Sequence, residues 1–205
     1  MTKPTDEELT KRAYDMAPEE WANYFDNSGG WPKELTKFHN LLPNGKILEV
    51  GAGTGRDAKD LVNLGYKYVG VDVSDKLLEL ARKNMPGCKF INMSLYDLDF
   101  SEKFDGFWAS AVYLHVPKRR IDEALQKLKA NLKKNAIGFI SIKDGAGEAL
   151  TVKELGDKEL SRFFSFWSKP EFENALKKSG FETLDYDYRI VSADTHWHMF
   201  IVKVA

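Results

Sequence analysis

A buried strand that runs directly into a glycine-rich turn constrains this chain more than any other feature. Residues 47–50 read Ile-Leu-Glu-Val, residues 51–55 read Gly-Ala-Gly-Thr-Gly, and a helical pattern begins at Arg56. Glycine permits a sharp turn and lets a ligand approach the backbone closely. A turn of this kind between a strand and a helix places the ligand beside the helix N-terminus, at the carboxyl edge of a sheet.

Strand and helix patterns alternate along the chain after this turn. The expected strands are 46–51, 68–73, 89–93, 104–112 and 136–143, and the expected helices are 56–65, 74–84, 117–132 and 169–180. Such alternation with short connections predicts a mostly parallel sheet that is covered by helices on both faces. Two final strands, 181–190 and 196–204, have no helix between them. They predict an antiparallel hairpin at one sheet edge, with a turn at 192–195. The fold class is therefore α/β, a Rossmann-like three-layer sandwich with an antiparallel C-terminal edge hairpin.

The N-terminal part of the chain precedes this pattern and is expected to be helical. Apolar residues recur at spacings of three and four over 5–26, which predicts one amphipathic helix, and a second helix is expected over 33–42. A chain of 205 residues is suited to one domain. We therefore expect a single domain over 1–205, with a helical cap over 1–45.

The acidic residue at the end of the second strand narrows the choice of ligand. Asp72 follows Gly51 by 21 residues (72 − 51), about the separation at which a carboxylate meets ribose hydroxyls in such folds. A dinucleotide fingerprint, G-x-G-x-x-G, needs a glycine where this chain has Arg56. An NAD(P)-dependent oxidoreductase therefore remains an alternative that the glycine spacing disfavours.

The glycine spacing, Glu49 two residues ahead of it, and Asp72 together resemble the first two motifs of class I S-adenosylmethionine-dependent methyltransferases. Residues 104–117 (FDGFWASAVYLHVP) are similar to the family's fourth strand and the turn after it, and residues 138–143 to its fifth strand. The similarity runs from about Lys46 to the C-terminus. It implies the same α/β fold, with the N-terminal helices as a variable cap.

Three short segments narrow the resemblance further. Residues 53–58 (GTGRDA), 114–118 (LHVPK) and 162–168 (RFFSFWS) resemble bacterial small-molecule methyltransferases of the tellurite-resistance-like type. The resemblance implies S-adenosylmethionine as cofactor and S-adenosylhomocysteine as product. It also implies in-line displacement of the methyl group toward a small-molecule acceptor.

The resemblance assigns roles to residues around the glycine loop. Glu49 is implied near the cofactor's amino group, Asp72 at both ribose hydroxyls and Val73 against the adenine. Arg56 either binds the cofactor carboxylate or is only an exposed residue in the first turn of a helix. The remaining candidates for cofactor binding are Gly51, Ala52, Gly53, Gly55, Ser94, Leu95 and Ala109.

The third strand departs from the family pattern. The family usually has an Asp directly after this strand, where it accepts a hydrogen bond from the adenine amino group, and here that position is Ser94. A hydroxyl can still accept this bond, but without the charge. The N–H of Leu95 could meet a ring nitrogen, and Asp97 could substitute if the loop were shifted. The departure keeps open a second function, a non-catalytic S-adenosylmethionine-binding sensor or partner module.

Several classes of methyl acceptor are disfavoured. Amino methyltransferases of nucleic-acid bases typically have Asn or Asp followed by Pro-Pro-aromatic after the fourth strand, and this chain does not. Cytosine C5 enzymes need a Pro-Cys nucleophile, and Cys88, the single cysteine, is far from that context. A formal net charge of −1 gives no general attraction to nucleic acid. A small-molecule acceptor is therefore expected, and nucleic acid is not.

His115 is the candidate general base, because a neutral histidine can accept a proton near pH 7. The alternative is a packed turn histidine that positions the helix beginning at Pro117. His196 and His198 share one face of a strand, which we expect to be exposed, and no metal site is expected. The candidates for the acceptor pocket are Tyr14, Trp31, Lys143, Arg162 and Phe163.

The location of the protein is inferred from its cysteine content and from hydropathy. One cysteine cannot form an internal disulfide, so a reducing, cytoplasmic location is expected. Residues 1–12 lack the apolar segment of a secretory signal, and no apolar run is long enough to span a bilayer. We therefore expect no membrane partner, and the sequence gives no indication of the oligomeric state.

Overall fold

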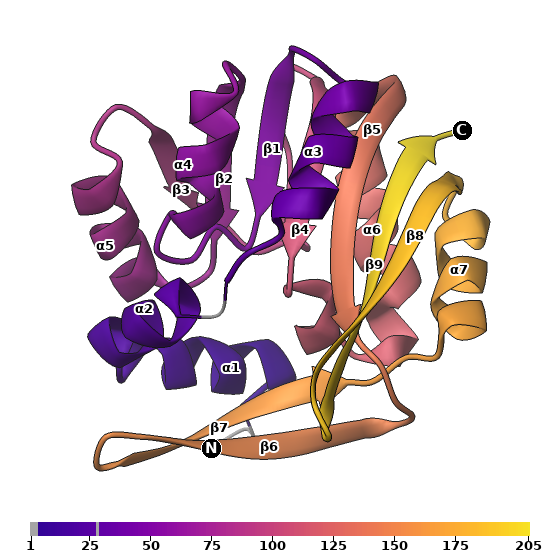
Figure 1. The fold of residues 1–205 in the computed structure, drawn as a ribbon. Coiled ribbons are helices and arrows are strands. Elements are labelled where there is room, and N and C mark those ends of the chain that lie inside the picture. The colour runs from indigo at the N-terminus through magenta and orange to yellow at the C-terminus, as the bar shows by residue number, and fades with distance from the viewer. Residues whose placement is uncertain (1–3, 28) are drawn as a thin grey trace.

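A seven-stranded sheet forms the centre of the protein (Figure 1). The computed structural model describes residues 4–27 and 29–205. In spatial order the strands are β3 (Lys89–Asn92), β2 (Lys67–Asp72), β1 (Lys46–Val50), β4 (Phe104–Ser110), β5 (Leu132–Lys143), β9 (Thr195–Val204) and β8 (Phe181–Ser192). The first five are parallel, and β9 is antiparallel to both of its neighbours. The expected mostly parallel sheet with a C-terminal edge hairpin is confirmed.

Helices cover both faces of this sheet, which gives the expected three layers. One face carries α6 (Ile121–Ala130) and α7 (Lys169–Lys178), whose apolar residues join the largest core cluster. The other face carries α3 (Pro32–Leu41), α4 (Arg56–Asn63) and α5 (Asp75–Asn84). The apolar positions of α6 that make this possible recur at spacings of one, three and four: Ile121, Ala124, Leu125 and Leu128.

The helix that precedes β1 packs directly against the sheet, within one of the two helical layers. Phe38 of α3 is fully buried and packs with Ile47 of β1 and Trp108 of β4. Its ring meets the indole of Trp108 edge-on, with the centroids 5.5 Å apart. Of the N-terminal helices, α3 therefore stabilises the sheet, and the two before it have a different position.

Two helices at the N-terminus lie across the carboxyl ends of the parallel strands (Figure 1). α1 (Asp6–Asp15) begins with a capping box formed by Thr5 and Glu8, and α2 (Pro18–Asp26) follows after a break. The prediction of one continuous helix over 5–26 is wrong. Pro18 has no N–H for the helix ladder and disfavours a helical conformation in the residue before it, so Ala17 leaves the helical region with φ −146° and ψ 55°.

A two-stranded hairpin that the sequence patterns did not reveal lies beside α1 (Figure 1). Its strands are β6 (Glu148–Leu155) and β7 (Lys158–Ser165), paired antiparallel. Leu160 of β7 packs with Ala13, Trp21 and Leu77 in a small core of its own. We use the word cap for α1, α2 and the β6–β7 hairpin, which together face the carboxyl edge of the sheet.

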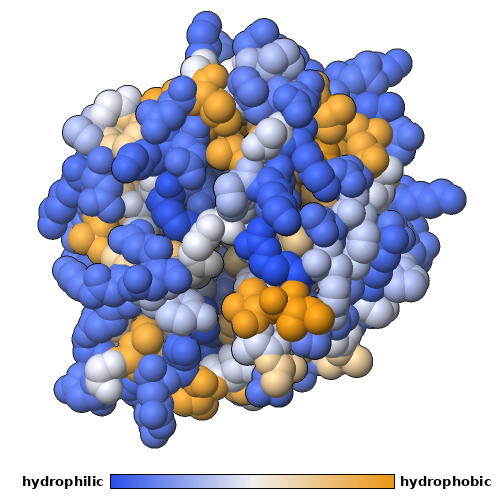
Figure 2. Space-filling model, in the orientation of Figure 1, coloured by the Kyte–Doolittle hydropathy of each residue, from blue (hydrophilic) through white to orange (hydrophobic). Residues whose placement is uncertain are grey.

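The start of α6 and the start of β5 each differ by four residues from the sequence prediction. A short 3-10 turn over Lys118–Arg120 precedes α6, and β5 begins at Leu132, four residues before the expected strand. Hydrophilic side chains cover most of the face shown in Figure 2, where apolar residues gather only in small groups. Among the residues that the structure describes, no helix has the length and apolar character needed to cross a membrane.

Candidate active site

A cavity of about 470 Å³ lies between the cap and the carboxyl edge of the sheet. The loop after β1, the end of β2 and the turn after β4 form one wall. Residues of α1, α2 and β7 form the opposite wall, and the β8–β9 hairpin closes one side. Ligands of open α/β sheets bind outside the carboxyl ends of the strands, so this cavity occupies the position that the fold favours for a ligand.

The glycine loop takes a left-handed backbone at two positions that line the cavity. Gly51 has φ +74° and Gly53 has φ +52°. A side chain on Gly51 would meet Val112 at 2.7 Å, whereas Gly53 has no atom within 4 Å of the place of a Cβ. The N–H of Gly53 donates to Oδ2 of Asp72 at 2.9 Å. The loop is thus held to the end of β2, and it leaves open space at Gly53.

Asp72 lines the same wall, with Val73 beside it. Its Oδ1 accepts from the N–H of Ser74 at 2.9 Å, so each carboxylate oxygen accepts one backbone bond. A carboxylate has about four acceptor sites, so two backbone bonds leave capacity for a pair of hydroxyls. Burial raises the pKa of Asp72 above its ordinary value, in opposition to these bonds.

Glu49 is the most deeply buried carboxylate at this wall, with 2 % of its surface exposed. The hydroxyl of Tyr68 donates to it. Burial, and then the negative charge of Asp57, raise the pKa of Glu49 well above its ordinary value. A cation beside Glu49 would oppose both effects.

Arg56 and Asp57 form an ion pair at the start of α4, with Nε and Oδ1 2.6 Å apart. Asp57 also accepts from the indole N–H of Trp108 at 2.9 Å, and Arg56 reaches the hydroxyl of Ser110 at 3.3 Å. Arg56 lines the cavity, so it is more than an exposed residue in the first turn of a helix. Trp31 donates to the same Ser110 hydroxyl at 2.6 Å, which links α3 to this wall.

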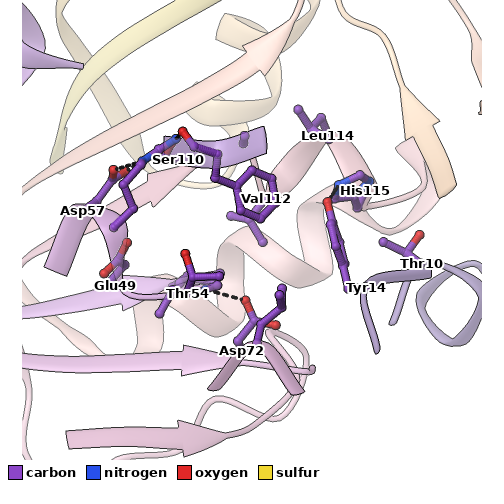
Figure 3. Close-up of a pocket in the computed structure, with 18 of the residues that line it drawn as sticks. Thr10, Tyr14, Glu49, Thr54, Asp57, Asp72, Ser110, Val112, Leu114 and His115 are labelled. Atoms are coloured by element: carbon purple, nitrogen blue, oxygen red, sulfur yellow. Dashed lines mark hydrogen bonds and ion pairs between the residues drawn. The ribbon is translucent and has the colours of Figure 1, made fainter. Parts of the chain in front are cut away.

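His115 lies across the cavity from Glu49 and Asp57, beside Tyr14 of α1 (Figure 3). Its Nδ1 lies 2.6 Å from the carbonyl oxygen of Phe163, which can only accept, so Nδ1 carries the proton. Nε2 therefore accepts from the Tyr14 hydroxyl at 2.8 Å, and that hydroxyl accepts from Nη1 of Arg162 at 3.0 Å. Burial, reinforced by the charge of Arg162, lowers the pKa of His115 to about 3.

Residues 47–135 match a family model described as "Methyltransferase domain". An uncharacterized protein of Methanocaldococcus jannaschii is 33% identical over 178 residues, which cover 83% of this chain and 82% of that protein. These two matches agree with the geometry of β1, the glycine loop and β2 described above. It belongs to the class I S-adenosylmethionine-dependent methyltransferases.

Solved structures share the fold of this methyltransferase. An S-adenosylmethionine-dependent methyltransferase from Methanosarcina mazei superposes with a TM-score of 0.71 at 18% identity, covering 82% of this chain and 96% of its own. A second, the Burkholderia thailandensis 1,6-didemethyltoxoflavin-N1-methyltransferase, was solved with 1,6-didemethyltoxoflavin and S-adenosylhomocysteine bound. Its TM-score is 0.68 at 19% identity, with 100% and 93% coverage. These likenesses show the fold. Membership of the family makes S-adenosylmethionine the cofactor and S-adenosylhomocysteine the product, and it disfavours the oxidoreductase and non-catalytic alternatives.

Most cofactor candidates of this methyltransferase line the cavity, and three do not. Gly55 instead packs toward Ala81 of α5, where a side chain would come within 3.4 Å. Ala109 is fully buried inside β4. Ser94 also lies outside the lining, whereas Leu95 belongs to it.

The reason for the position of Ser94 is a residue that the sequence analysis missed. Its hydroxyl donates to Oε2 of Glu7 on α1 at 2.7 Å. Glu7 lines the cavity, next to Met93, Leu95 and Tyr96 from the loop after β3. Burial raises the pKa of Glu7. A carboxylate is therefore present near the end of β3 after all, but it comes from the cap.

The acceptor candidates are brought together with one exception. Tyr14, Trp31, Lys143 and Arg162 line the cavity, but Phe163 points the other way and Phe164 takes its place. Side chains alternate along a strand, so on β7 Arg162 and Phe164 share one face and Phe163 the other. No strand was expected here, so the alternation of side chains along a strand could not be applied to these residues.

The β8–β9 hairpin supplies further lining residues that were not expected. These are Arg189, Val191, Thr195 and Trp197. The prediction that His198 lies on an exposed face is wrong, because 4 % of it is exposed and its Nε2 lies 2.9 Å from Asp144. Within residues 4–27 and 29–205, no group of three or more His, Cys, Asp or Glu side chains could hold a metal ion.

Proposed function

We propose that this methyltransferase transfers a methyl group to a small molecule that enters the cavity between the cap and the sheet. The observation that carries this proposal is the position of the cap: its residues line one cavity together with the glycine loop and Asp72, so that a small acceptor could be held beside the cofactor. The Burkholderia neighbour holds a small molecule and S-adenosylhomocysteine in the same fold, which supports the proposal.

The chemistry is an in-line displacement, in which proximity and alignment contribute most of the rate. A lone pair of the acceptor forms the new bond to the methyl carbon, and the bond between that carbon and the sulfonium sulfur breaks. Its electron pair stays on sulfur, which becomes the neutral thioether of S-adenosylhomocysteine. The chain's contribution is to orient the two reactants and to exclude water.

The cofactor roles that we propose follow the cavity wall. Asp72 would accept from both ribose hydroxyls, Val73 would pack on the adenine and Glu49 would face the amino group. Gly51, Ala52 and Gly53 would pass beside the methionine portion. Free acceptor capacity on Asp72 and the open space at Gly53 support this placement.

Glu7 would take the adenine role that the family gives to an Asp after the third strand. Its carboxylate, oriented by the Ser94 hydroxyl, would accept from the adenine amino group, and the N–H of Leu95 would meet a ring nitrogen. The hydrogen bond to Ser94 and the shared cavity wall support this assignment. Adenine binding would then require the cap to be in place.

We assign His115 a positioning role. A group whose conjugate acid has a pKa of about 3 is a weak base at neutral pH, and its Nε2 already accepts from Tyr14. By accepting from that hydroxyl, His115 would fix Tyr14, which in turn meets Arg162. This supports the packed-histidine alternative over the general base.

The finer subgroup and the location are proposals as well. The segments 53–58, 114–118 and 162–168 support a tellurite-resistance-like subgroup, and the single cysteine supports a cytoplasmic protein. We also propose that residues 1–205 form one domain.

Calorimetry with S-adenosylhomocysteine, followed by turnover with methyl-labelled S-adenosylmethionine, tests the proposed function. We expect saturable binding of one nucleoside and transfer of label to a member of a small-molecule panel. No binding of S-adenosylhomocysteine, or fluorescence changes with NADH instead, would contradict it. Binding without transfer to any member of a broad panel would favour the non-catalytic module.

A further inference from the structure

Two cations in the cavity have no carboxylate partner in the part of the chain that the structure describes. Nζ of Lys143 makes no hydrogen bond or ion pair there, and lies 4.7 Å from the ring centroid of Phe164. The guanidinium of Arg162 lies 4.9 Å from the centroid of the same Phe164 ring. Both cations line the cavity.

Arg162 is the more buried of the two, with 9 % of its surface exposed. Nη1 donates to the Tyr14 hydroxyl at 3.0 Å, while Nε is buried with no acceptor. Its guanidinium also lies 4.1 Å from the ring centroid of Trp21. Cation–π contacts stabilise a desolvated cation, but they leave its charge uncompensated.

The two charges also act on one another. Burial, and then the charge of Arg162, lower the pKa of Lys143. Bringing two like charges into one desolvated cavity is unfavourable unless an anion is bound with them. Their arrangement is therefore that of a site whose counter-ion arrives with the ligand.

Other arginines at this cavity show that pairing is the rule there. Arg56 is paired with Asp57 at 2.6 Å, and Arg189 with Glu34 at 3.1 Å. Both pairs are part of the folded protein itself, because their carboxylates come from helices α4 and α3. Among the residues that the structure describes, the charged groups of Lys143 and Arg162 instead contact aromatic rings and the Tyr14 hydroxyl.

We propose that the methyl acceptor is a small molecule with an oxyanionic group, a carboxylate or a phosphate-type group, that binds between Lys143 and Arg162. The proposal rests on the proposed function, since it names the class of its substrate. A guanidinium and an ammonium are the donors best suited to such a group. Phe164 and Trp197, which flank Lys143, would pack against the apolar part of the acceptor.

The test uses the full chain saturated with S-adenosylhomocysteine, so that the cofactor's own carboxylate already has its place. Calorimetry or ligand-observed NMR then compares acids with matched neutral probes: acetate with acetamide, benzoate with benzamide, and phenylphosphonate with its dimethyl ester. We expect at least one acid to bind ten-fold more tightly than its neutral partner. The carboxylate and phosphonate arms distinguish the two kinds of oxyanion.

Variants assign the binding to this site. Lys143→Gln should weaken binding of the preferred acid at least five-fold. Arg162→Lys should also weaken this binding, while keeping the positive charge and the fold. Lys153→Gln is the matched control, because Lys153 lies against the Tyr24 ring on the same hairpin but does not line the cavity. This control should leave acid binding within two-fold of the wild type.

Three results would overturn the proposal. One is that no acid binds more tightly than its neutral partner. This outcome is expected if the carboxylate of S-adenosylhomocysteine is bound by the two cations. The others are that Lys143→Gln and Arg162→Lys leave acid binding unchanged, or that Lys153→Gln weakens it as much. Loss of S-adenosylhomocysteine binding in the wild type would instead contradict the proposed function, so the two failures are distinguishable.

Discussion

The two ends of the cavity are lined by ionisable side chains of opposite kind. At one end, which we call the acidic end, Glu7, Glu49 and Asp72 have pKa values raised by burial. At the other, the cationic end, Lys143 and Arg162 have no carboxylate partner among the described residues. S-adenosylmethionine brings a sulfonium and an amino cation, so buried carboxylates suit it, whereas a buried pair of cations suits an anion. The contrast teaches that the side chains at each end need a ligand group of opposite charge to compensate them.

The largest effect should follow from removing the ribose acceptor at the acidic end. We expect Asp72→Asn to weaken the binding of S-adenosylhomocysteine by about 30-fold or more, because two hydrogen bonds to a charged group are worth about 2–3 kcal/mol together. Calorimetry measures this, with Asp99→Asn, an exposed carboxylate beyond β3, as control. Equal losses in the two variants would contradict the role of Asp72.

A substitution on the cap tests whether the acidic end extends beyond the sheet. We expect Glu7→Ala to weaken the binding of S-adenosylhomocysteine about ten-fold, because one charge-assisted hydrogen bond is lost. The wild type should prefer S-adenosylhomocysteine over S-inosylhomocysteine, which has a carbonyl in place of the amino group, and the variant should not. Ser94→Ala keeps Glu7 and should keep the preference. If Ser94→Ala abolishes it and Glu7→Ala does not, Ser94 is the acceptor.

At the cationic end, removal of a charge should stabilise the ligand-free protein. We expect Lys143→Met to raise the free energy of unfolding by about 1 kcal/mol, because a buried cation near Arg162 is replaced by an apolar side chain of similar length. Denaturant unfolding measures it, with Lys153→Met as the control that should change little. A clear loss of stability in Lys143→Met would show that Lys143 has a partner in the folded protein.

The smallest effect concerns protons at Glu49. Its raised pKa means that stability linked to Glu49 is present at low pH and lost as pH rises through that pKa. The amino cation of the cofactor should lower this pKa, so binding should release protons and affinity should rise with pH between the free and bound values. Calorimetry in two buffers of different ionisation enthalpy measures the release. Proton uptake, or a release that persists in Glu49→Gln, would contradict this role.

The two ends also differ in how far the sequence could predict them. The acidic end could be predicted mainly from local pattern, because a strand, a glycine loop and Asp72 lie within 26 residues (72 − 47 + 1) of one strand–helix–strand unit. Glu7 is the exception. It reaches the site only through the packing of α1 against the loop after β3, which no spacing in the sequence encodes.

The cationic end depends on contacts between distant segments. Arg162 and Lys143 could be named from composition, but Phe163 was chosen where Phe164 lines the cavity, an error of one residue on a strand. The turn signal Gly156-Asp157 between alternating residues could have revealed the β6–β7 hairpin and set its parity. That no described carboxylate pairs with the two cations could not be read from the sequence, because it depends on the folded arrangement.

A crystal structure of the complex with S-adenosylhomocysteine tests the two-ended cavity most directly. We expect the ribose hydroxyls on Asp72, the adenine amino group at Glu7, and the cofactor's carboxylate away from Lys143 and Arg162, which stay open to the acceptor. A complex in which that carboxylate lies against Lys143 and Arg162 would contradict the account, because the cationic end would then belong to the cofactor.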